Sequence, residues 1–138
     1  MHGVDERRVQ LWIDALRSGE YQQGQGWLET AINVEDGASD LVMVTRHCCL
    51  GVAQRVALKN GWVPQGGVHS VYWGQSSMDL GAARWFGFEC SDPLLLDLYN
   101  DHEPLLCVAA NDDHDWTFEQ IAQALEDRYI TGVEVTGV

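Results

Sequence analysis

The spacing of apolar residues constrains the fold of this 138-residue chain more than any other feature. Three segments carry apolar residues at positions i, i+3, i+4 and i+7, the pattern of an amphipathic helix. These residues are Val9, Trp12, Ile13 and Leu16, then Cys49, Val52, Ala53 and Val56, then Phe118, Ile121, Ala122 and Leu125. Because strands and helices do not alternate regularly between them, the pattern predicts an α+β fold.

Helix caps and turn residues give approximate bounds to the elements. Helices are expected at 5–18, from the end of a strand at 41–45 to about residue 60, at 80–86, and after Thr117, where Gln120 completes a capping box. Strands are expected at 27–32 and 41–45 as a hairpin, with a short strand at 68–73 and a strand or extended segment at 105–110. Asp92 starts a turn or helix through Pro93, and 131–138 is either a frayed tail or a short edge strand. We therefore predict a small single domain over 1–138, with about four helices and a short antiparallel hairpin or sheet.

The negative charge is concentrated in the second part of the chain. The net charge is −13, and residues 1–88 hold nine Asp and Glu against seven Lys and Arg. Residues 89–138 hold twelve acids against Arg128 alone. Such a surface repels a phosphate backbone, so we expect no direct nucleic-acid partner. The excess either serves solubility or docks onto a basic surface.

No apolar run is long enough for a membrane span, and the N-terminus lacks the apolar core of a signal peptide. A cytoplasmic protein without a membrane partner is expected. The four cysteines have neither zinc-site nor disulfide-framework spacing, which favours reduced thiols.

Cys48 and Cys49 stand where a strand leads into a helix, and a helix N-terminus lowers the pKa of a thiol. A thiolate enzyme also needs a histidine base and an orienting amide or carboxylate. His114, His47 or His69, with Asn111 or Asp112, would complete a catalytic set around Cys48, which we expect to be better exposed than Cys49. The competing interpretation, which we favour, is that both cysteines are core residues.

The segment Asn111-Asp112-Asp113-His114-Asp115 precedes the last helix. Alternating oxygen side chains at 111, 113 and 115 could hold a hard cation. Asn and Asp at this position also hydrogen-bond free N–H groups and favour the positive end of a helix. We favour that second role, so neither a metal nor a cofactor is expected.

Tryptophan, tyrosine and glutamine residues gather in segments without helical spacing. This aromatic and amide-rich set comprises Tyr21, Gln22, Gln23, Gln25, Trp27, Trp62, His69, Tyr72, Trp73 and Gln75. Aromatic rings combined with amides suit the recognition of proteins or small ligands. We expect most of the rings in the core and Trp62 and Trp73 among the exposed anchors.

Several short motifs occur in a characteristic order along the chain. They are Trp12 with Ala15-Leu16-Arg17-Ser18-Gly19, Tyr21, Gln23-Gly24, Cys48-Cys49-Leu50-Gly51-Val52, Trp85-Phe86-Gly87, Asn111-Asp112, Thr117-Phe118 and Ile121-Ala122. In this order and spacing the chain resembles a family of small proteins encoded by phages, especially phages of actinobacteria. The resemblance implies a phage accessory protein in the host cell and brings no known activity with it.

The leading functional hypothesis is a small acidic, non-enzymatic protein that binds and modulates or inhibits a host or phage protein. Its partner would present a basic surface, and a nucleic-acid-binding protein is the sharpest version. The predicted contact residues are Asp112, Asp113, Asp115, Glu119, Glu126, Trp62 and Trp73. A second hypothesis is a protein that binds or processes a small ligand at Cys48, His114, Asn111 and Asp112. A third is a structural role in a homo-oligomer.

Overall fold

The computed structural model describes residues 4–35, 41–99 and 103–131 of the chain. Within these ranges, five α-helices accompany a three-stranded mixed sheet and a two-stranded antiparallel sheet. The molecule is therefore a small α+β domain, as the apolar spacing predicts.

The three helices with regular apolar spacing are all present. They are α1 (Glu6–Arg17), α2 (Cys49–Lys59) and α5 (Phe118–Leu125), and their apolar stripes are buried. The N-cap of α1 is Asp5, whose carboxylate accepts a hydrogen bond from the Arg8 N–H. The capping box of α5 is complete, and a π-helical segment, η2 (Glu126–Ile130), continues that helix.

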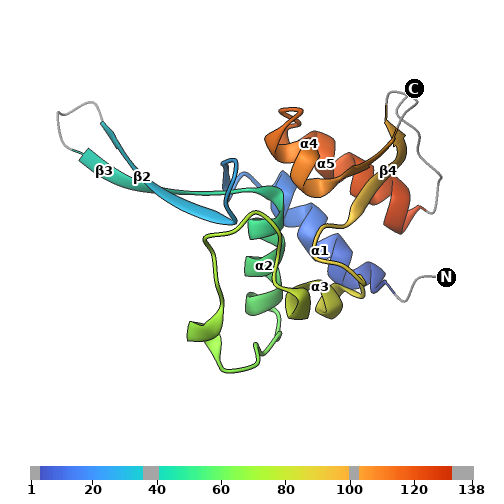
Figure 1. The fold of residues 1–138 in the computed structure, drawn as a ribbon, viewed down its shortest axis with the longest axis horizontal. Helices are drawn as coiled ribbons and strands as arrows, with labels where there is room; N and C mark the ends of the chain where they lie inside the picture. The colour runs from blue at the N-terminus through green and yellow to red at the C-terminus, as the bar shows by residue number, and fades with distance from the viewer. Residues whose placement is uncertain (1–3, 36–40, 100–102, 132–138) are drawn as a thin grey trace.

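The α1 helix packs against both α2 and α5 at the centre of the molecule (Figure 1). Trp12 on α1 is fully buried, and its ring centroid lies 5.6 Å from that of Phe86 and 6.1 Å from that of Phe88. Its indole Nε1–H donates a 3.0 Å hydrogen bond to the Cys49 carbonyl at the start of α2. One aromatic side chain thus joins α1, α2 and the end of α3 (Leu80–Phe86), which stops at the left-handed Gly87 as predicted.

The three-stranded sheet has the order β1-β3-β2. Strands β2 (Glu29–Glu35) and β3 (Leu41–His47) form the predicted antiparallel hairpin, with Glu29 opposite His47. The two-residue strand β1 (Gln22–Gln23) runs parallel to β3. The far end of the hairpin projects away from the helices, whereas its near end leads directly into α2 (Figure 1).

A second sheet differs from the sequence prediction. Residues after Asp92 and Pro93 continue as β4 (Leu94–Tyr99) rather than as a helix, and β4 pairs with β5 (Glu103–Leu106). The run Leu94-Leu95-Leu96 has no alternation to signal a strand. Residues 105–110 were also predicted incorrectly, because only the first two belong to a strand and α4 (Cys107–Asp112) begins immediately afterwards.

The cap of α4 explains why the sequence does not reveal this helix. Its N-cap residue, Leu106, has no side-chain oxygen, and the carboxylate of Asp92 instead accepts a 2.9 Å hydrogen bond from the Val108 N–H. Burial raises the pKa of the Asp92 carboxyl, although the hydrogen bonds from the backbone favour its charged form.

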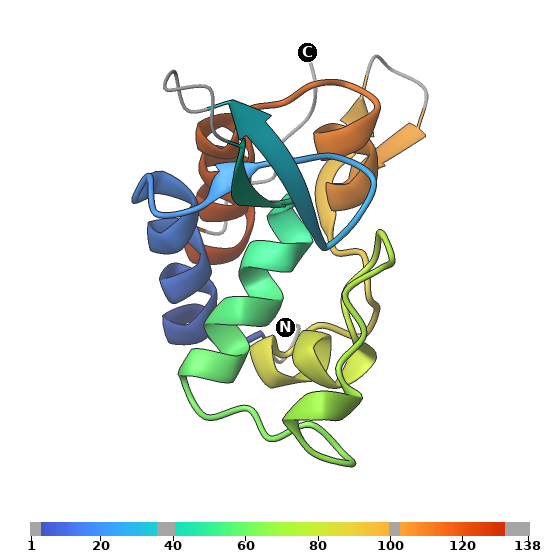
Figure 2. The ribbon, with the colours of Figure 1, turned by 90° about the vertical axis from the view of Figure 1, so that its left-hand side faces the viewer.

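The predicted strand at 68–73 is wrong. Val68–Ser70 forms a 3-10 helix, η1, directly after Gly66 and Gly67, which both adopt positive φ and turn the chain. The fully buried Gln54 of α2 then fixes the following loop, since its amide accepts from the Asp79 N–H and donates to the Tyr72 carbonyl. Figure 2 shows this loop on one side of α2 and α1 on the other. Of the predicted tail at 131–138, all residues after Thr131 lie outside the described ranges.

We expect Gly51→Ala to destabilise the fold strongly. The backbone of α2 lies so close to the end of the loop before β2 that a Cβ at Gly51 would overlap the Leu28 carbonyl. In an unconstrained helix the same change stabilises by about 1 kcal/mol, whereas here we expect a loss of more than about 3 kcal/mol. Urea unfolding followed by circular dichroism measures the difference, and an unchanged midpoint would contradict the close approach.

Candidate functional site

The structure brings together the two segments that the sequence singles out, Cys48-Cys49 and Asn111–Asp115. The N-cap of α2 is Cys48, which makes no side-chain capping bond. The side chain of Asn111, at the end of α4, supplies the missing acceptor: its Oδ1 accepts a 3.2 Å hydrogen bond from the Cys49 N–H. The two segments therefore meet at the entrance of α2, 62 positions apart in the chain.

Asn111 is fully buried and uses both ends of its amide. Its Oδ1 also accepts a 2.9 Å hydrogen bond from Gln23 Nε2. Its Nδ2 donates to the Gly24 carbonyl and to Asp112 Oδ1, each at 2.8 Å. A buried amide with all its hydrogen bonds made rigidifies its surroundings, which is a structural role rather than a reactive one.

Further hydrogen bonds tie the loop of residues 23–26 to the turn between α4 and α5. Gln23 Nε2 donates to the Trp116 carbonyl at 2.7 Å. Gln25 Nε2 donates to the Asn111 carbonyl and, at 2.7 Å, to Asp115 Oδ1, while the Gly26 N–H donates to Asp112 Oδ1. We call these bonds and those of Asn111 the Asn111 network. The sequence placed both glutamines on a recognition surface and missed their part in this network, for which no spacing signal exists.

The burial of the thiols disfavours a catalytic role for them. Cys49 is fully buried, as its position on the apolar face predicts, but Cys48 is only 3% exposed, so the expected exposure of Cys48 is wrong. Burial raises the pKa of Cys48 to about 12 and that of Cys49 well above its usual value. The desolvation of the charged form outweighs the effect of the helix N-terminus, and the expected thiolate is therefore not favoured. The Cys49 thiol instead points to the Cys107 carbonyl, 3.6 Å away.

None of the three candidate histidines contacts a thiol within the described residues. His114 is exposed and its ring lies against Tyr99, with 4.8 Å between the centroids. The nearly buried His47 ring places Nε2 3.0 Å from Glu29 Oε2, and His69 lies exposed in η1. The residues of the hypothetical catalytic set, Cys48, His114, Asn111 and Asp112, thus lie near one turn without the contacts that acid–base or nucleophilic chemistry needs.

Two of the three aspartates at the end of α4 and in the turn after it, Asp112 and Asp115, accept hydrogen bonds. Asp112 is half-buried, whereas Asp113 and Asp115 are exposed, and Asp115 adopts a left-handed backbone with φ +53°. In the described ranges, no cluster of three or more His, Cys, Asp or Glu side chains is arranged to hold a metal ion.

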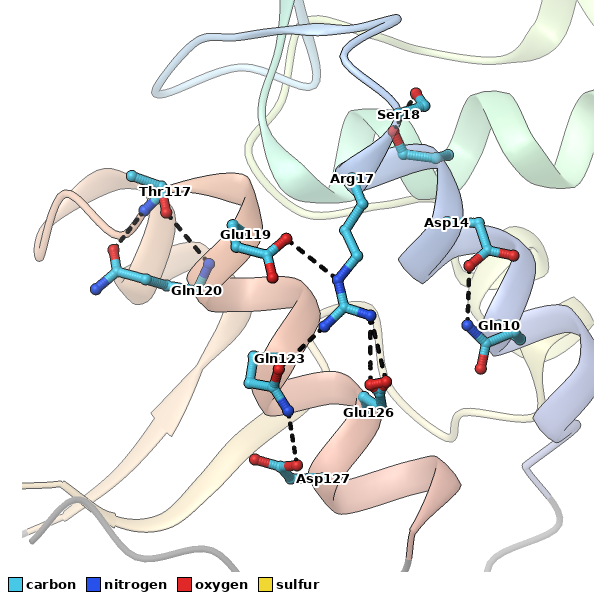
Figure 3. A network of polar contacts seen from close by, with 11 residues as sticks. Gln10, Asp14, Arg17, Ser18, Thr117, Glu119, Gln120, Gln123, Glu126 and Asp127 are labelled. Atoms are coloured by element: carbon cyan, nitrogen blue, oxygen red, sulfur yellow. Dashed lines mark hydrogen bonds and ion pairs between the residues drawn. The ribbon is translucent and has the colours of Figure 1, made fainter.

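The two glutamates predicted to bind a partner are already paired within the molecule (Figure 3). Arg17, in the last turn of α1, reaches across to α5 and contacts Glu119 at 3.1 Å and Glu126 at 3.2 Å. Its second terminal nitrogen donates to Gln123 Oε1 at 3.1 Å. These carboxylates hold α1 against α5 and raise the pKa of the Arg17 guanidinium.

The predicted tryptophan anchors are only partly available. Trp62 and Trp73 are both half-buried, and the Arg55 guanidinium covers the Trp73 ring at 4.1 Å from its centroid. The exposed rings are instead those of Trp27, at 51%, and Tyr72, at 64%.

A shallow depression of about 330 Å³ lies beside the Asn111 network. It is lined by Gln23, Gly24, Gln25, Arg46, Asp115 and Trp116. A second depression, of about 360 Å³, is lined by Asp5, Arg7, Arg8, Leu11, Asn60 and Trp85.

The geometry defines a small α+β domain whose polar centre is a buried amide network. The profile of one protein family matches residues 4–129, nearly the whole chain. The chain belongs to this family, which is described as a domain of unknown function (DUF8296). No curated protein and no solved structure matches the chain. In the described part of the chain, no helix combines the length and apolar character needed to cross a membrane.

We expect Asn111→Ala to cost about 2–4 kcal/mol of unfolding free energy, because it strands several buried polar groups at once. Asn60→Ala is the matched control: Asn60 is an exposed residue, and its amide donates one bond, to the Val56 carbonyl. Equal losses in urea unfolding would contradict the central role of Asn111.

The variant Asn111→Asp tests the donor half of the same amide. It places a carboxylate oxygen where Nδ2 now donates to Gly24 and Asp112. Burial beside another carboxylate raises the pKa of the new group, so its folded form prefers the protonated acid. The variant should therefore lose stability, relative to the parent protein, as pH rises above about 4, where the unfolded aspartate ionises, and regain it below that pH.

A thiol titration tests the burial of the cysteines. Of the four free thiols, only that of Cys90 is exposed. We expect one thiol to react rapidly with an aromatic disulfide reagent at neutral pH, and all four to react in denaturant. Cys90→Ser should abolish the rapid reaction. Rapid modification of Cys48 or Cys49 in the native protein would instead support the enzyme hypothesis.

Proposed function

We propose that this protein is a small acidic binding protein that engages a basic surface of a partner protein through the turn between α4 and α5. The contact residues are Asp112, Asp113 and Asp115, which we call the aspartate turn. The proposal keeps the aspartates of the sequence prediction and assigns Glu119 and Glu126 to holding α1 against α5.

The chemistry of the groups that hold the aspartates supports this choice. Asp112 accepts from the Gly26 N–H and the Asn111 amide, and Asp115 accepts from the Gln25 amide. Asp113 is exposed, and its side chain makes no hydrogen bond or ion pair with any described residue. Neutral donors position the other two carboxylates without neutralising them, so the charge of the turn remains available to a cationic partner.

Most basic residues of the chain, in contrast to the aspartate turn, have a counterion within the molecule. Five of the eight form ion pairs: Arg8 with Asp5, Arg17 with Glu119 and Glu126, Arg55 with Glu29, Lys59 with Glu20 and Arg128 with Asp97. Most cations are thus bound to acids elsewhere, and none forms an ion pair with the aspartate turn among the described residues. Charges of this kind steer a basic partner and raise its association rate.

Aromatic side chains flank the aspartate turn. The Tyr99 ring packs against both His114 and Trp116, with centroid distances of 4.8 and 6.2 Å. Leu98 next to it is 44% exposed. Lysine and arginine side chains bind well where carboxylates and aromatic faces lie together, because the ring faces attract cations.

The resemblance to phage-encoded proteins supports a setting for this function. We infer that the protein acts in the host cytoplasm on a host or phage protein. The most specific form of this proposal is that the partner is a nucleic-acid-binding protein. Such a protein presents Lys and Arg to the phosphate backbone, so an acidic turn would compete for the same residues.

Paired charge variants test the proposal. The protein is used as bait in host lysate, and the affinity of the purified captured partner is then measured by calorimetry. We expect Asp113→Asn/Asp115→Asn to weaken binding at least tenfold, and the parent affinity to fall as salt increases. Asparagine keeps the acceptor for Gln25 and tolerates the left-handed backbone of residue 115.

The matched control is Glu6→Gln/Glu89→Gln, which removes two exposed charges that form no ion pair with the described residues. It should leave the affinity within about twofold of the parent. Equal weakening by both double variants would show that only net charge matters. Full binding by the aspartate variant would assign recognition to the aromatic loops around Trp62 and Trp73.

A further inference from the structure

The depression beside the Asn111 network combines opposite charges that do not pair with each other. Arg46 and Asp115 both line it, yet they form no ion pair within 4.0 Å. The guanidinium of Arg46 is exposed and makes no hydrogen bond with the described residues. A cation and an anion kept apart in one depression are complementary to a ligand that carries both charges.

The glutamines of the depression are fixed with their oxygens free. Gln23 Nε2 donates to Asn111 Oδ1 and the Trp116 carbonyl, while Gln25 Nε2 donates to the Asn111 carbonyl and Asp115 Oδ1. Backbone carbonyls accept only, so neither amide can be turned over without opposing two oxygens. Their Oε1 atoms accept no hydrogen bond from the rest of the described chain.

Arg46 is held on the central strand of its sheet. Its backbone pairs with Gln22 of β1 and Thr30 of β2, and Gly24 packs so closely that a Cβ there would lie 2.9 Å from Arg46 Cβ. The base of the Arg46 side chain is therefore anchored on a strand that is paired on both sides.

The donor and acceptor groups match those of an amino acid. An ammonium group carries three N–H donors, and Asp115 with the two free Oε1 atoms offers three acceptors. A guanidinium binds a carboxylate through two parallel hydrogen bonds. A purely anionic ligand would face Asp115, and a purely cationic one would face Arg46, so a zwitterion fits best.

We infer that this depression binds a free amino acid, with its carboxylate on Arg46 and its ammonium group on Asp115, Gln23 and Gln25. Trp116 is the aromatic residue in the lining of the depression. A volume of about 330 Å³ lies at the lower end of the range for small-molecule sites, as a ligand of this size requires. The inference goes beyond the proposed function and is measured on the protein alone.

The experiment uses nuclear magnetic resonance of the full, ¹⁵N-labelled protein. The probe is an equimolar mixture of the twenty common amino acids, followed by each one separately, at millimolar concentration. We expect at least one amino acid to shift the Trp116 indole N–H signal and the Gln23 and Gln25 amide signals in a saturable manner. Its amide, which lacks the carboxylate, and its N-acetyl form, which lacks the ammonium group, should bind at least tenfold more weakly.

Charge-matched variants locate the site. Arg46→Gln and Asp115→Asn should each weaken binding at least tenfold. Arg84→Gln and Glu89→Gln change the charge by the same amounts at exposed positions outside the depression and should leave binding unchanged. The folded state of each variant is read from the dispersion of its own spectrum.

Three results would overturn the inference. The first is the absence of any saturable shift with all twenty amino acids. The second is equal binding of the N-acetyl or amide form, which would assign the site to one end of a peptide. The third is equal binding of inorganic phosphate or putrescine, which would reveal a simple anion or cation site. Loss of partner binding in Arg46→Gln plays no part in this test, so the two proposals fail separately.

Discussion

The buried amide of Asn111 is the interaction on which the rest of the structure depends. It caps α2, whose own N-cap residue has no side-chain oxygen, and it also holds the loop of residues 23–26 in place. Asp92 plays the same part for α4, where Leu106 cannot cap. Two helix entrances therefore rely on side chains from distant segments, and the loops that provide or surround those side chains become part of the core.

The sequence predicted the elements whose signals are local. Apolar spacing located α1 and α5, the latter with its cap at Thr117, and the hairpin followed from two apolar runs around a polar loop. The α4 helix and β4 were missed because their signals are not local: one has a borrowed cap, and the other has three successive leucines. Likewise, the sequence could suggest that Cys49 and Asn111 are adjacent but could not establish it, and the burial of Cys48 depends on packing that no spacing encodes.

Charge is divided between two uses in this molecule. Arg17 shows the first, since one guanidinium holds Glu119, Gln123 and Glu126 and thereby fastens α1 to α5. The aspartate turn shows the second, because neutral amides hold its carboxylates in place and leave their charge without a counterion. Acidic residues that look alike in the sequence therefore have different roles in the folded protein. The two roles are distinguished by whether a charged or a neutral donor binds the carboxylate.

The position of Asn111 late in the chain sets an order of events during synthesis. The N–H of Cys49 and the Gly24 carbonyl find their partner only after residue 111 has left the ribosome. Until then, the hairpin and α2 can form but lack the hydrogen bonds that hold them in place, and their apolar faces stay exposed to solvent. Contacts of such long sequence separation also close slowly, because a large loop must be ordered before they form. A chain that stops short of residue 111 should therefore remain a substrate for chaperones and proteases rather than a smaller version of the domain.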